Sequence, residues 1–437
     1  MPLHDDEMNK RREKREAQRK RQQAEAKRMK RTLILAAVVL VLCGVGIFRL
    51  TRNTEDPAAA QSQQETRETE APTEASRATA PAEQDPITTI HIRAAGDLNV
   101  TQKVVDAGLS ASGYDYSRAF KDVAAILAEA DLTVMNFEGN ICGEPYGSET
   151  TSAPAELLRD LRGAGVDLLQ AANSCIINNG MIGMTSTLQA IRAAGIEPLG
   201  AYANASELRQ SKGYTITEVQ GIKVAFVAFT KGLGGRGMPA GNENLVNLLY
   251  VDYATTYNEE DTDRITKILK NVEAEKPDIT IAMLHWGSEY NDDISSSQEY
   301  IVSLMKKNGV DVILGTHPHT LQPIDYDPLK GTLVAYSLGD FFGDASRGGT
   351  NYSIILDIEI TKDSNAGTTK VTDYSYTPIY TVTETECDGY RRVVRIDKAI
   401  EAYQENFLDK VTETCKDNMV YALQRIEERL KMPEEED

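Results

Sequence analysis

The stretch VDVILGTHPH, Val310–His319, joins an apolar run to two histidines that flank a proline. The run ends at Leu314, and its length and composition are those of a buried β-strand. His317 and His319 are two of only five histidines in 437 residues. Because Pro318 fixes a turn past the strand, we expect both imidazole rings to reach one cavity at its carboxyl end.

The same pattern, an apolar strand that ends in polar residues, recurs along the chain. Further predicted strands deliver Asp97, Asn136 with Glu138, Asn173 and His285. Predicted helices alternate with these strands, over residues 116–130, 155–165 and 185–195. This alternation predicts an α/β protein. Sites in open α/β sheets form at the carboxyl ends of the strands, so we expect these side chains to share one rim.

A mixture of imidazole, carboxylate and amide groups at one rim indicates a divalent metal site. Imidazole with carboxylate suits manganese, iron or zinc better than calcium. Two histidines can serve one metal or two, and a pair of metals ~3.5–4 Å apart can clamp both oxygens of a phosphoryl displacement. The alternative is histidines that are satisfied in the core or lie on the surface. His4 in the tail and His91 inside the first strand do not join this group.

The residues that follow His285 each have two interpretations. Trp286 is the only tryptophan, and it either lines the pocket or packs in the core. Glu289 and Tyr290 either line the pocket or cap the loop. These alternatives stay open at the level of sequence.

Charge and cysteine content limit the partners. The chain carries a net charge of −19, and residues 1–49 carry thirteen Lys and Arg against six Asp and Glu, which leaves −26 on the remainder. Such an acidic body argues against nucleic acid as a partner, because phosphate contacts need clustered Lys and Arg. The five cysteines form no CxxC pair, so they are either buried thiols or one or two disulfides of undetermined pairing.

Thr32–Phe48 is an uninterrupted apolar run that predicts a transmembrane helix over residues 32–49. The basic segment before it, residues 1–31, places the N-terminus in the cytoplasm and the main domain outside the cell, in a single-pass cell-membrane protein. The alternatives are a cleaved signal peptide, a lipoprotein box at Cys43 and a buried helix. Residues 50–86 lack hydrophobic periodicity and predict a disordered linker.

The main domain is predicted over residues 87–345, and residues 346–437 add predicted edge strands and a helical extension. The extension has apolar residues at helical spacing from Ile396 to Val411, and this stripe either packs on the domain or binds a partner.

Five motifs occur together in order: Gly96-Asp97, Asn136-Phe137-Glu138, His285-Trp286-Gly287-x-Glu289-Tyr290, Gly315-x-His317-Pro318-His319 and Tyr336-Ser337-Leu338-Gly339. Together they resemble the CapA-type capsule synthesis proteins associated with poly-γ-glutamate, over about Ile87–Asp344. That resemblance implies the two-sheet α/β sandwich of calcineurin-like metallophosphoesterases, with a dinuclear site at the strand ends.

Carried over by position, the resemblance assigns Asp97, Glu138 and His319 to one metal and Glu138, His285 and His317 to the other. Asn173 is a further expected ligand. The expected catalytic residues are Asp97, Glu138, Asn173, Cys175 and His285. The expected pocket residues are Trp286, Glu289, Tyr290, Asn99 and Asp340.

The sequence departs from that family in the loop after the third strand. Where the family has Ala-Asn-Asn-His-x-x-Asp-x-Gly, Ser174 replaces the second Asn, Cys175 the His and Asn178 the Asp. Asp340 also stands where the family has Asn. Losing one transition-state donor can cost ~10²–10³ in rate, so the departures weaken or abolish hydrolysis. Cys175 is alternatively a metal ligand or nucleophile, or a buried thiol.

Three functions therefore compete. The first is a metal-dependent, phosphoesterase-like hydrolase of the cell surface. The second is a catalytically degenerate protein that binds a polymer or partner proteins. The third is an export or anchoring component of a polyglutamate-type capsule machine, acting with other membrane components. We favour a role in synthesis, export or anchoring of a surface polymer.

Overall fold

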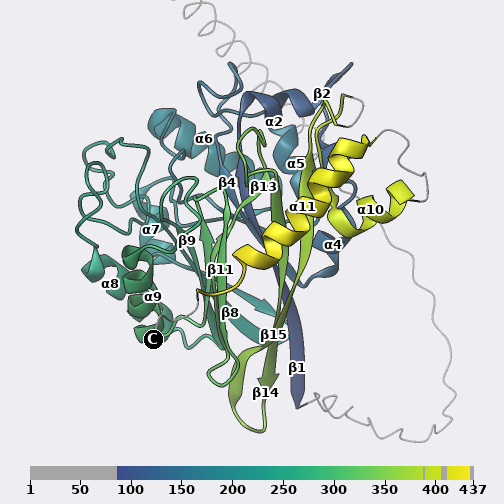
Figure 1. Ribbon diagram of the computed structural model, residues 1–437. Coiled ribbons are helices and arrows are strands. Elements are labelled where there is room, and N and C mark those ends of the chain that lie inside the picture. Colours follow the sequence, from purple (N-terminus) through teal and green to yellow (C-terminus); the bar gives the residue numbers. More distant parts are fainter. Residues whose placement is uncertain (1–85, 387–388, 405–410, 434–437) are drawn as a thin grey trace, which may run out of the picture. The chain divides into compact units, whose positions relative to one another are not determined.

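The structure is a computed structural model that describes residues 86–386, 389–404 and 411–433 (Figure 1). The predicted tail and transmembrane helix, and all of the predicted linker except its last residue, lie outside these ranges. Among the described helices, none has the length and apolar character that a membrane crossing requires. The described residues all belong to one compact unit, Pro81–Asp437.

An eight-stranded sheet forms one half of this unit. Its order is β16-β15-β14-β1-β4-β5-β6, and β13 also pairs with β1. Strands β1, β4, β5 and β6 run parallel, so their carboxyl ends share one edge. The bounds are β1 (Ile87–Asn99), β4 (Leu132–Glu138), β5 (Leu168–Gln170), β6 (Glu197–Leu199), β13 (Asp340–Phe342), β14 (Tyr352–Asp363), β15 (Thr368–Val382) and β16 (Arg392–Arg395).

A six-stranded sheet of order β11-β12-β10-β9-β8-β7 forms the other half. Strands β12, β10, β9 and β8 run parallel, and β11 and β7 are antiparallel edges. The bounds are β7 (Thr215–Val219), β8 (Ile222–Thr230), β9 (Ile279–His285), β10 (Val312–Thr316), β11 (Leu321–Asp327) and β12 (Thr332–Leu338). A short hairpin, β2 (Leu109–Ser110) with β3 (Gly113–Tyr114), lies apart from both sheets.

The alternation of side chains along the strands builds three apolar layers. Val134 of β4 faces the core between the sheets, whereas Met135 faces the helices on the outer side. On that side lie α2 (Gln102–Ala107), α3 (Ser117–Phe120), α4 (Ala124–Glu129), α5 (Glu156–Gly163) and part of α6 (Gly180–Ala193). Helices α8 (Thr262–Ala274) and α9 (Ser296–Lys307) cover the outer face of the six-stranded sheet. The prediction of a two-sheet α/β sandwich is thus confirmed.

Two predicted elements differ in the structure. The helix predicted over residues 116–130 is interrupted by a turn at 121–123, which separates α3 from α4. The strands after residue 346 are not simply edge strands: β14 lies in the interior of its sheet, paired with β1 from Ile87↔Asp363 to Ala95↔Ile355. The physical reason is that β14 is apolar on both faces, with Ile354 toward the inter-sheet core and Ile355 toward the helices.

The predicted C-terminal stripe packs on the domain. Ile396 and Ala399 of α10 (Ile396–Gln404) are buried in the core that lies between the sheets. A further helix, α11 (Glu413–Arg429), begins at Thr412, whose side chain accepts a hydrogen bond from the Cys415 N–H. Met419 of α11 is buried in the same core, and the helix crosses β14 and β15 (Figure 1).

Candidate metal centre

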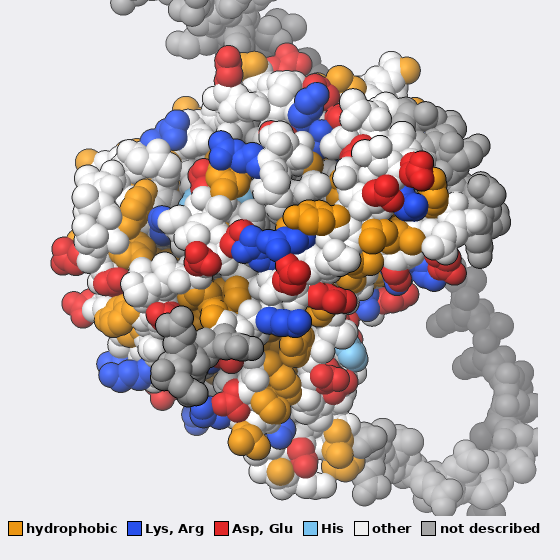
Figure 2. All heavy atoms as spheres, viewed as in Figure 1, with side chains coloured by type: hydrophobic (Ala, Val, Ile, Leu, Met, Phe, Trp, Pro, Cys, Tyr) orange, Lys and Arg blue, Asp and Glu red, His pale blue; other side chains and the backbone are white. Residues whose placement is uncertain are grey.

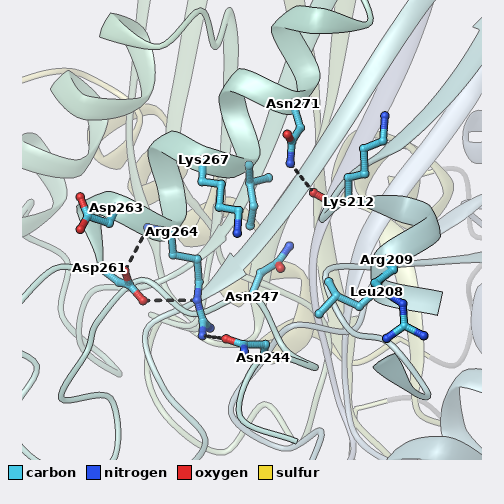
Figure 3. Close-up of a pocket in the computed structure, with 11 residues that line it drawn as sticks. Leu208, Arg209, Lys212, Asn244, Asn247, Asp261, Asp263, Arg264, Lys267 and Asn271 are labelled. Atoms are coloured by element: carbon cyan, nitrogen blue, oxygen red, sulfur yellow. Dashed lines mark hydrogen bonds and ion pairs between the residues drawn. The ribbon is translucent and has the colours of Figure 1, made fainter. Parts of the chain in front are cut away.

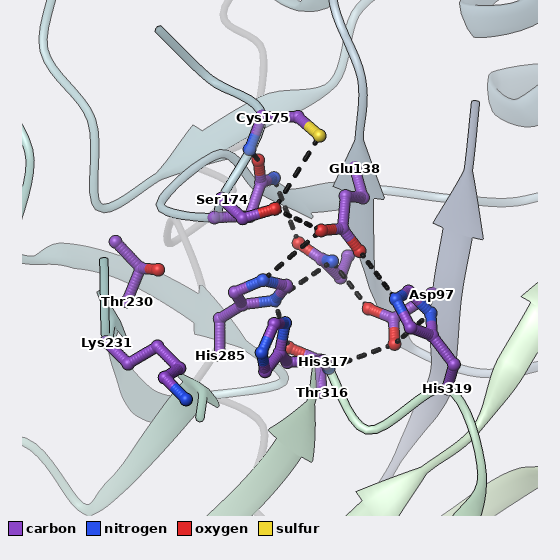
Figure 4. A network of polar contacts seen from close by, with 12 residues as sticks. Asp97, Glu138, Ser174, Cys175, Thr230, Lys231, His285, Thr316, His317 and His319 are labelled. Carbon is purple, nitrogen blue, oxygen red and sulfur yellow. Dashed lines mark hydrogen bonds and ion pairs between the residues drawn. The ribbon is translucent and has the colours of Figure 1, made fainter. Parts of the chain in front are cut away.

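The carboxyl ends of the parallel strands bring a compact group of acids and histidines together (Figure 4). The group consists of six predicted site residues, each at most 7% exposed: Asp97, Glu138, His285, His317, His319 and Asp340. They come from β1, β4, β9, the turn after β10, and β13. Burial of so many ionisable groups is costly unless they are paired or bind a cation. We call these six residues the metal-ligand cluster.

Glu138 lies at the centre of the cluster. One carboxylate oxygen, Oε1, is 3.4 Å from His285 Nε2, and the other, Oε2, is 3.7 Å from His319 Nε2. The His319 Nδ1 atom lies 3.7 Å from Asp97 Oδ2. Two groups of possible ligands share Glu138, and within each group the ligand atoms lie within 4.8 Å of one another. One group is Glu138, His285 and His317, and the other is Asp97, Glu138 and His319. Glu138 belongs to both, as the predicted bridging carboxylate should.

Three buried polar atoms of this cluster have no hydrogen-bond partner: Glu138 Oε2, His285 Nε2 and His317 Nδ1. A buried polar atom without a partner costs about 1–3 kcal/mol, so three of them in one cluster call for an explanation. A divalent metal ion supplies it, because carboxylate oxygen and imidazole nitrogen are ligands of manganese, iron and zinc. The residues present therefore fit the predicted metal.

A buried hydrogen-bond relay fixes the tautomer of His285. The Gln170 side-chain amide donates to the backbone oxygens of Ala172 and Phe229, so its Oε1 accepts from the Thr316 hydroxyl at 3.1 Å. Because the Thr316 hydroxyl donates its only hydrogen to Gln170, its oxygen can only accept a hydrogen bond from His285 Nδ1, which lies 3.2 Å away. The contact of Nδ1 with Thr316 is closer than its contact with the Asn136 amide nitrogen at 3.5 Å, which favours the proton at Nδ1 and leaves the lone pair of Nε2 facing the cluster. Neither Gln170 nor Thr316 was among the predicted site residues, although Thr316 directly precedes the His-Pro-His motif.

Asp340 orients His319 in a comparable way. The His319 Nδ1–H donates to Asp340 Oδ1 at 2.7 Å, which leaves Nε2 directed at Glu138. Asp97 accepts from the Asn136 side-chain amide at 2.6 Å and from the His317 N–H at 3.0 Å. Asn136 thus has a supporting role that we had not assigned to it.

The protonation states follow from burial and from neighbouring charges. Burial raises the pKa of Asp97, and it raises the pKa of Asp340 to about 7. Burial and the neighbouring His285 hold the pKa of His317 well below its ordinary value. Burial by itself would raise the pKa of Glu138, but the neighbouring histidines, above all His285, lower that pKa below the usual range. An anionic Glu138 and a neutral His317 are the forms that bind metals.

The backbone around Pro318 explains how both rings reach the cluster. His317 has φ 94° and His319 has φ 60°, both in the left-handed region that residues other than glycine rarely adopt. These conformations turn the chain after β10, and the two ring centroids lie 6.1 Å apart. Backbone strain of this kind is concentrated at functional sites. Both rings therefore lie in the same group of possible metal ligands, and the shared cavity stays a prediction.

The loop after β5 holds the residues that depart from the resembled family. The Ser174 hydroxyl donates to Glu138 Oε1 at 2.5 Å. The Asn173 side chain is engaged at both ends: its amide donates to the Phe137 carbonyl, and its oxygen accepts from the Cys175 N–H. Burial, followed by the Glu138 charge, raises the pKa of the partly exposed Cys175 to about 12 in the metal-free protein, which argues against a nucleophilic thiolate there. The metal-ligand role of Asn173 stays a prediction.

The predicted pocket residues divide into two groups. Trp286 is 1% exposed and packs in the outer core, where its Nε1–H donates to the Tyr336 carbonyl at 2.9 Å, so our placement of Trp286 in the pocket is wrong. Glu289 lies beside the cluster and shares a possible ligand set with His317 and His319. The ring of Tyr290 stacks on His319 at 5.5 Å. Asn99 lies opposite Glu138 in the pairing of β1 with β4.

A cavity also lies away from the metal-ligand cluster. It measures about 590 Å³ and lies between α7 (Ala205–Ser211) and α8 (Figure 3). Two hydrogen bonds link the segments around this cavity: the Arg264 guanidinium donates to the Val246 carbonyl, and the Asn271 amide donates to the Lys212 carbonyl. It shares no residue with the metal-ligand cluster.

Comparison with known proteins places the sequence among capsule proteins. The family model of the bacterial capsule synthesis protein PGA_cap matches residues 91–345. The PGA biosynthesis protein CapA of Bacillus subtilis is 27% identical over 252 residues, 56% of this chain and 61% of that protein. The capsule biosynthesis protein CapA of Bacillus anthracis is 26% identical over 278 residues, 62% and 64% of the two chains. This chain thus spans less than two thirds of the length of these relatives.

Two solved structures are similar in part. The calcineurin-like phosphoesterase YfkN of Bacillus subtilis superposes with a TM-score of 0.42 at 16% identity, covering 78% of this chain and 98% of that one. A phosphatase of Mycoplasma pneumoniae gives a TM-score of 0.41 at 14% identity, covering 67% and 94%. At such low TM-scores and identities the likeness carries no information about function.

Proposed function

Because the chain belongs to the bacterial capsule synthesis protein family PGA_cap, we propose that it acts in the synthesis, export or anchoring of a poly-γ-glutamate-type surface polymer. In this proposal the metal-ligand cluster holds one or two divalent ions of manganese, iron or zinc. A bound ion would supply a positive centre for anionic groups and Lewis-acid activation of a bound oxygen. The acidic body, with −26 outside residues 1–49, needs such a centre to approach an anionic polymer.

The observation that carries the proposal is a set of three buried atoms that have no hydrogen-bond partner among the described residues: Glu138 Oε2, His285 Nε2 and His317 Nδ1. A purely structural cluster would satisfy these atoms within the protein. Their convergence on one point supports a use that requires a cation.

We further propose that Thr32–Phe48 anchors the protein in the cell membrane, with the basic segment in the cytoplasm and the main domain outside. This arrangement supports cooperation with other membrane components of a capsule machine. It rests on the sequence alone, since these residues lie outside the described part of the chain.

A second candidate function is a polymer- or protein-binding scaffold that does not catalyse hydrolysis. The observation that favours it is the loop after β5, where Cys175 has a pKa of about 12 and provides no cationic donor. The hydrolase and the scaffold share the metal-ligand cluster and differ in turnover.

Metal content of the purified full-length chain, measured by elemental mass spectrometry, tests the proposal. The variant His317→Ala/His319→Ala removes two ligands, and His4→Ala/His91→Ala is the matched control because His91 is exposed and pairs with Asp357 outside the cluster. We expect one or two metals per chain, lost only in the first variant. About two ions would favour the hydrolase and about one the scaffold, whereas none after reconstitution with manganese, iron and zinc would refute the metal proposal. Polymer binding should also weaken when EDTA is added.

A further inference from the structure

Two cationic side chains lie at the rim of the metal-ligand cluster and have not yet been given a role. Lys231 follows β8, and its backbone N–H donates to the His285 carbonyl at 2.7 Å. Arg347 lies in the loop after β13, with its guanidinium 4.0 Å from the ring centroid of Tyr290. Neither forms a salt bridge with any residue that the structure describes. On the face shown in Figure 2, by contrast, Lys and Arg side chains are interspersed with Asp and Glu.

Lys231 is held in place although its charge is half-buried. Its ammonium group donates to the Gly287 carbonyl and lies 4.7 Å from the ring centroid of Tyr257. A desolvated cation is costly without an anionic partner, so a partner from outside the protein is the physical expectation. Figure 4 shows Lys231 beside His285 and His317, on the opposite side of His317 from His319.

Arg347 continues the rim on the other side. Tyr290 stacks on His319 at 5.5 Å, and Arg347 stacks on Tyr290. Tyr290 has φ 60°, a strained conformation that positions its ring between the histidine and the arginine. The described residues form no hydrogen bond or salt bridge with this guanidinium, whose planar set of donors suits anions such as carboxylate or phosphate.

We propose that Lys231 and Arg347 bind successive negative groups of an anionic oligomer that runs across the metal-ligand cluster. A succession of rings separates the two cations: Arg347 lies against Tyr290, Tyr290 stacks on His319, and His319 lies beside His317, on whose other side Lys231 lies. The ligand class is therefore a chain of repeated carboxylates or phosphates. This inference rests on the proposed function, whose metal centre the oligomer would cross.

Binding of fluorescent oligo-γ-glutamate of about ten residues to the full-length chain, followed by polarisation, tests the inference. The variant is Lys231→Met/Arg347→Met. The matched control is Lys223→Met/Arg118→Met. Lys223 is half-buried in β8, the strand that precedes Lys231, and donates to the Glu275 carbonyl, and Arg118 is exposed and stacks 3.7 Å from the ring centroid of Tyr390. Both variants remove the same charge. Unlabelled polyphosphate, orthophosphate and glutarate serve as competitors.

We expect at least tenfold weaker binding in Lys231→Met/Arg347→Met and less than twofold in the control. Oligo-γ-glutamate or polyphosphate, whichever competes better, identifies the repeating group. Equal weakening in both variants, or orthophosphate and glutarate competing as well as the oligomers, would overturn the inference. Metal content is measured in parallel and should be unchanged in both variants. If the wild type contained no metal and binding of the oligomer were still weakened only in Lys231→Met/Arg347→Met, the proposed metal would be refuted and the anion site would stand.

Discussion

Replacement of Thr316 by valine isolates the relay that prepares His285 for metal binding. The substitution keeps the shape of the side chain and removes the hydroxyl that bridges Gln170 Oε1 and His285 Nδ1. Both buried groups then lose a partner at about 1–3 kcal/mol each, partly offset by the added methyl group. We expect the free energy of unfolding of the metal-free protein to fall by about 2–4 kcal/mol.

The same change should weaken metal binding. Without the Thr316 oxygen, nothing holds the proton on His285 at Nδ1, and the tautomer protonated at Nε2 blocks the ligand atom. Loss of such an outer hydrogen bond typically reduces metal affinity about 10–100-fold. Manganese or zinc titration by calorimetry measures the affinity, and urea unfolding in EDTA measures the stability.

Two controls separate the relay from general destabilisation. Thr316→Ser keeps the hydroxyl and should retain the affinity. Thr133→Val removes another buried hydroxyl, which donates to the Leu127 carbonyl at 2.7 Å far from the cluster, and should lower stability alone. If Thr316→Val bound metal as tightly as the wild type, the assignment of the His285 tautomer to this relay would be refuted.

Three further predictions concern packing, titration and reactivity. Gly315→Ala should lower stability by about 1–3 kcal/mol or more and reduce metal content, because its Cβ would lie 1.9 Å from the Tyr336 oxygen. Asp311→Asn should stabilise the protein by about 1–3 kcal/mol at pH 7 and not at pH 4. Burial raises the pKa of Asp311 from 3.8 to about 6, so the folded state binds the proton more tightly and wild-type stability falls as pH rises through that interval. Cys175 should resist iodoacetamide at pH 8 in the native protein and react after unfolding, as mass spectrometry of the peptides would show.

Each has an outcome that would contradict it. Gly163→Ala, in α5 with open space around its Cβ, should not destabilise, and an equal loss at both glycines would argue against the contact of Gly315 with Tyr336. A stability difference for Asp311→Asn that is the same at pH 4 and pH 7 would exclude the raised pKa. Rapid native alkylation of Cys175 would show that its thiolate is accessible.

Sequence alone determined where the chemistry lies along the chain. Apolar runs that end in Asp97, Glu138, His285 and the His-Pro-His motif are local signals, and parallel strands bring their carboxyl ends to one edge of each sheet. The α/β class followed from the alternation of predicted strands and helices, and the two-sheet sandwich followed from the family resemblance. These features were predictable because each depends on a few neighbouring residues.

Only the tertiary structure decided what prepares those residues for use. The relay joins Thr316 to Gln170, 146 residues earlier, and Ser174 reaches Glu138 across 36 residues. The interior position of β14 likewise depends on its pairing with β1, more than 250 residues away in sequence. Contacts of this kind are set by how the sheets stack and by which buried groups must satisfy one another, and no local periodicity encodes them. The sequence therefore specifies the candidate ligands, and the packing of distant segments specifies their tautomers, charges and directions.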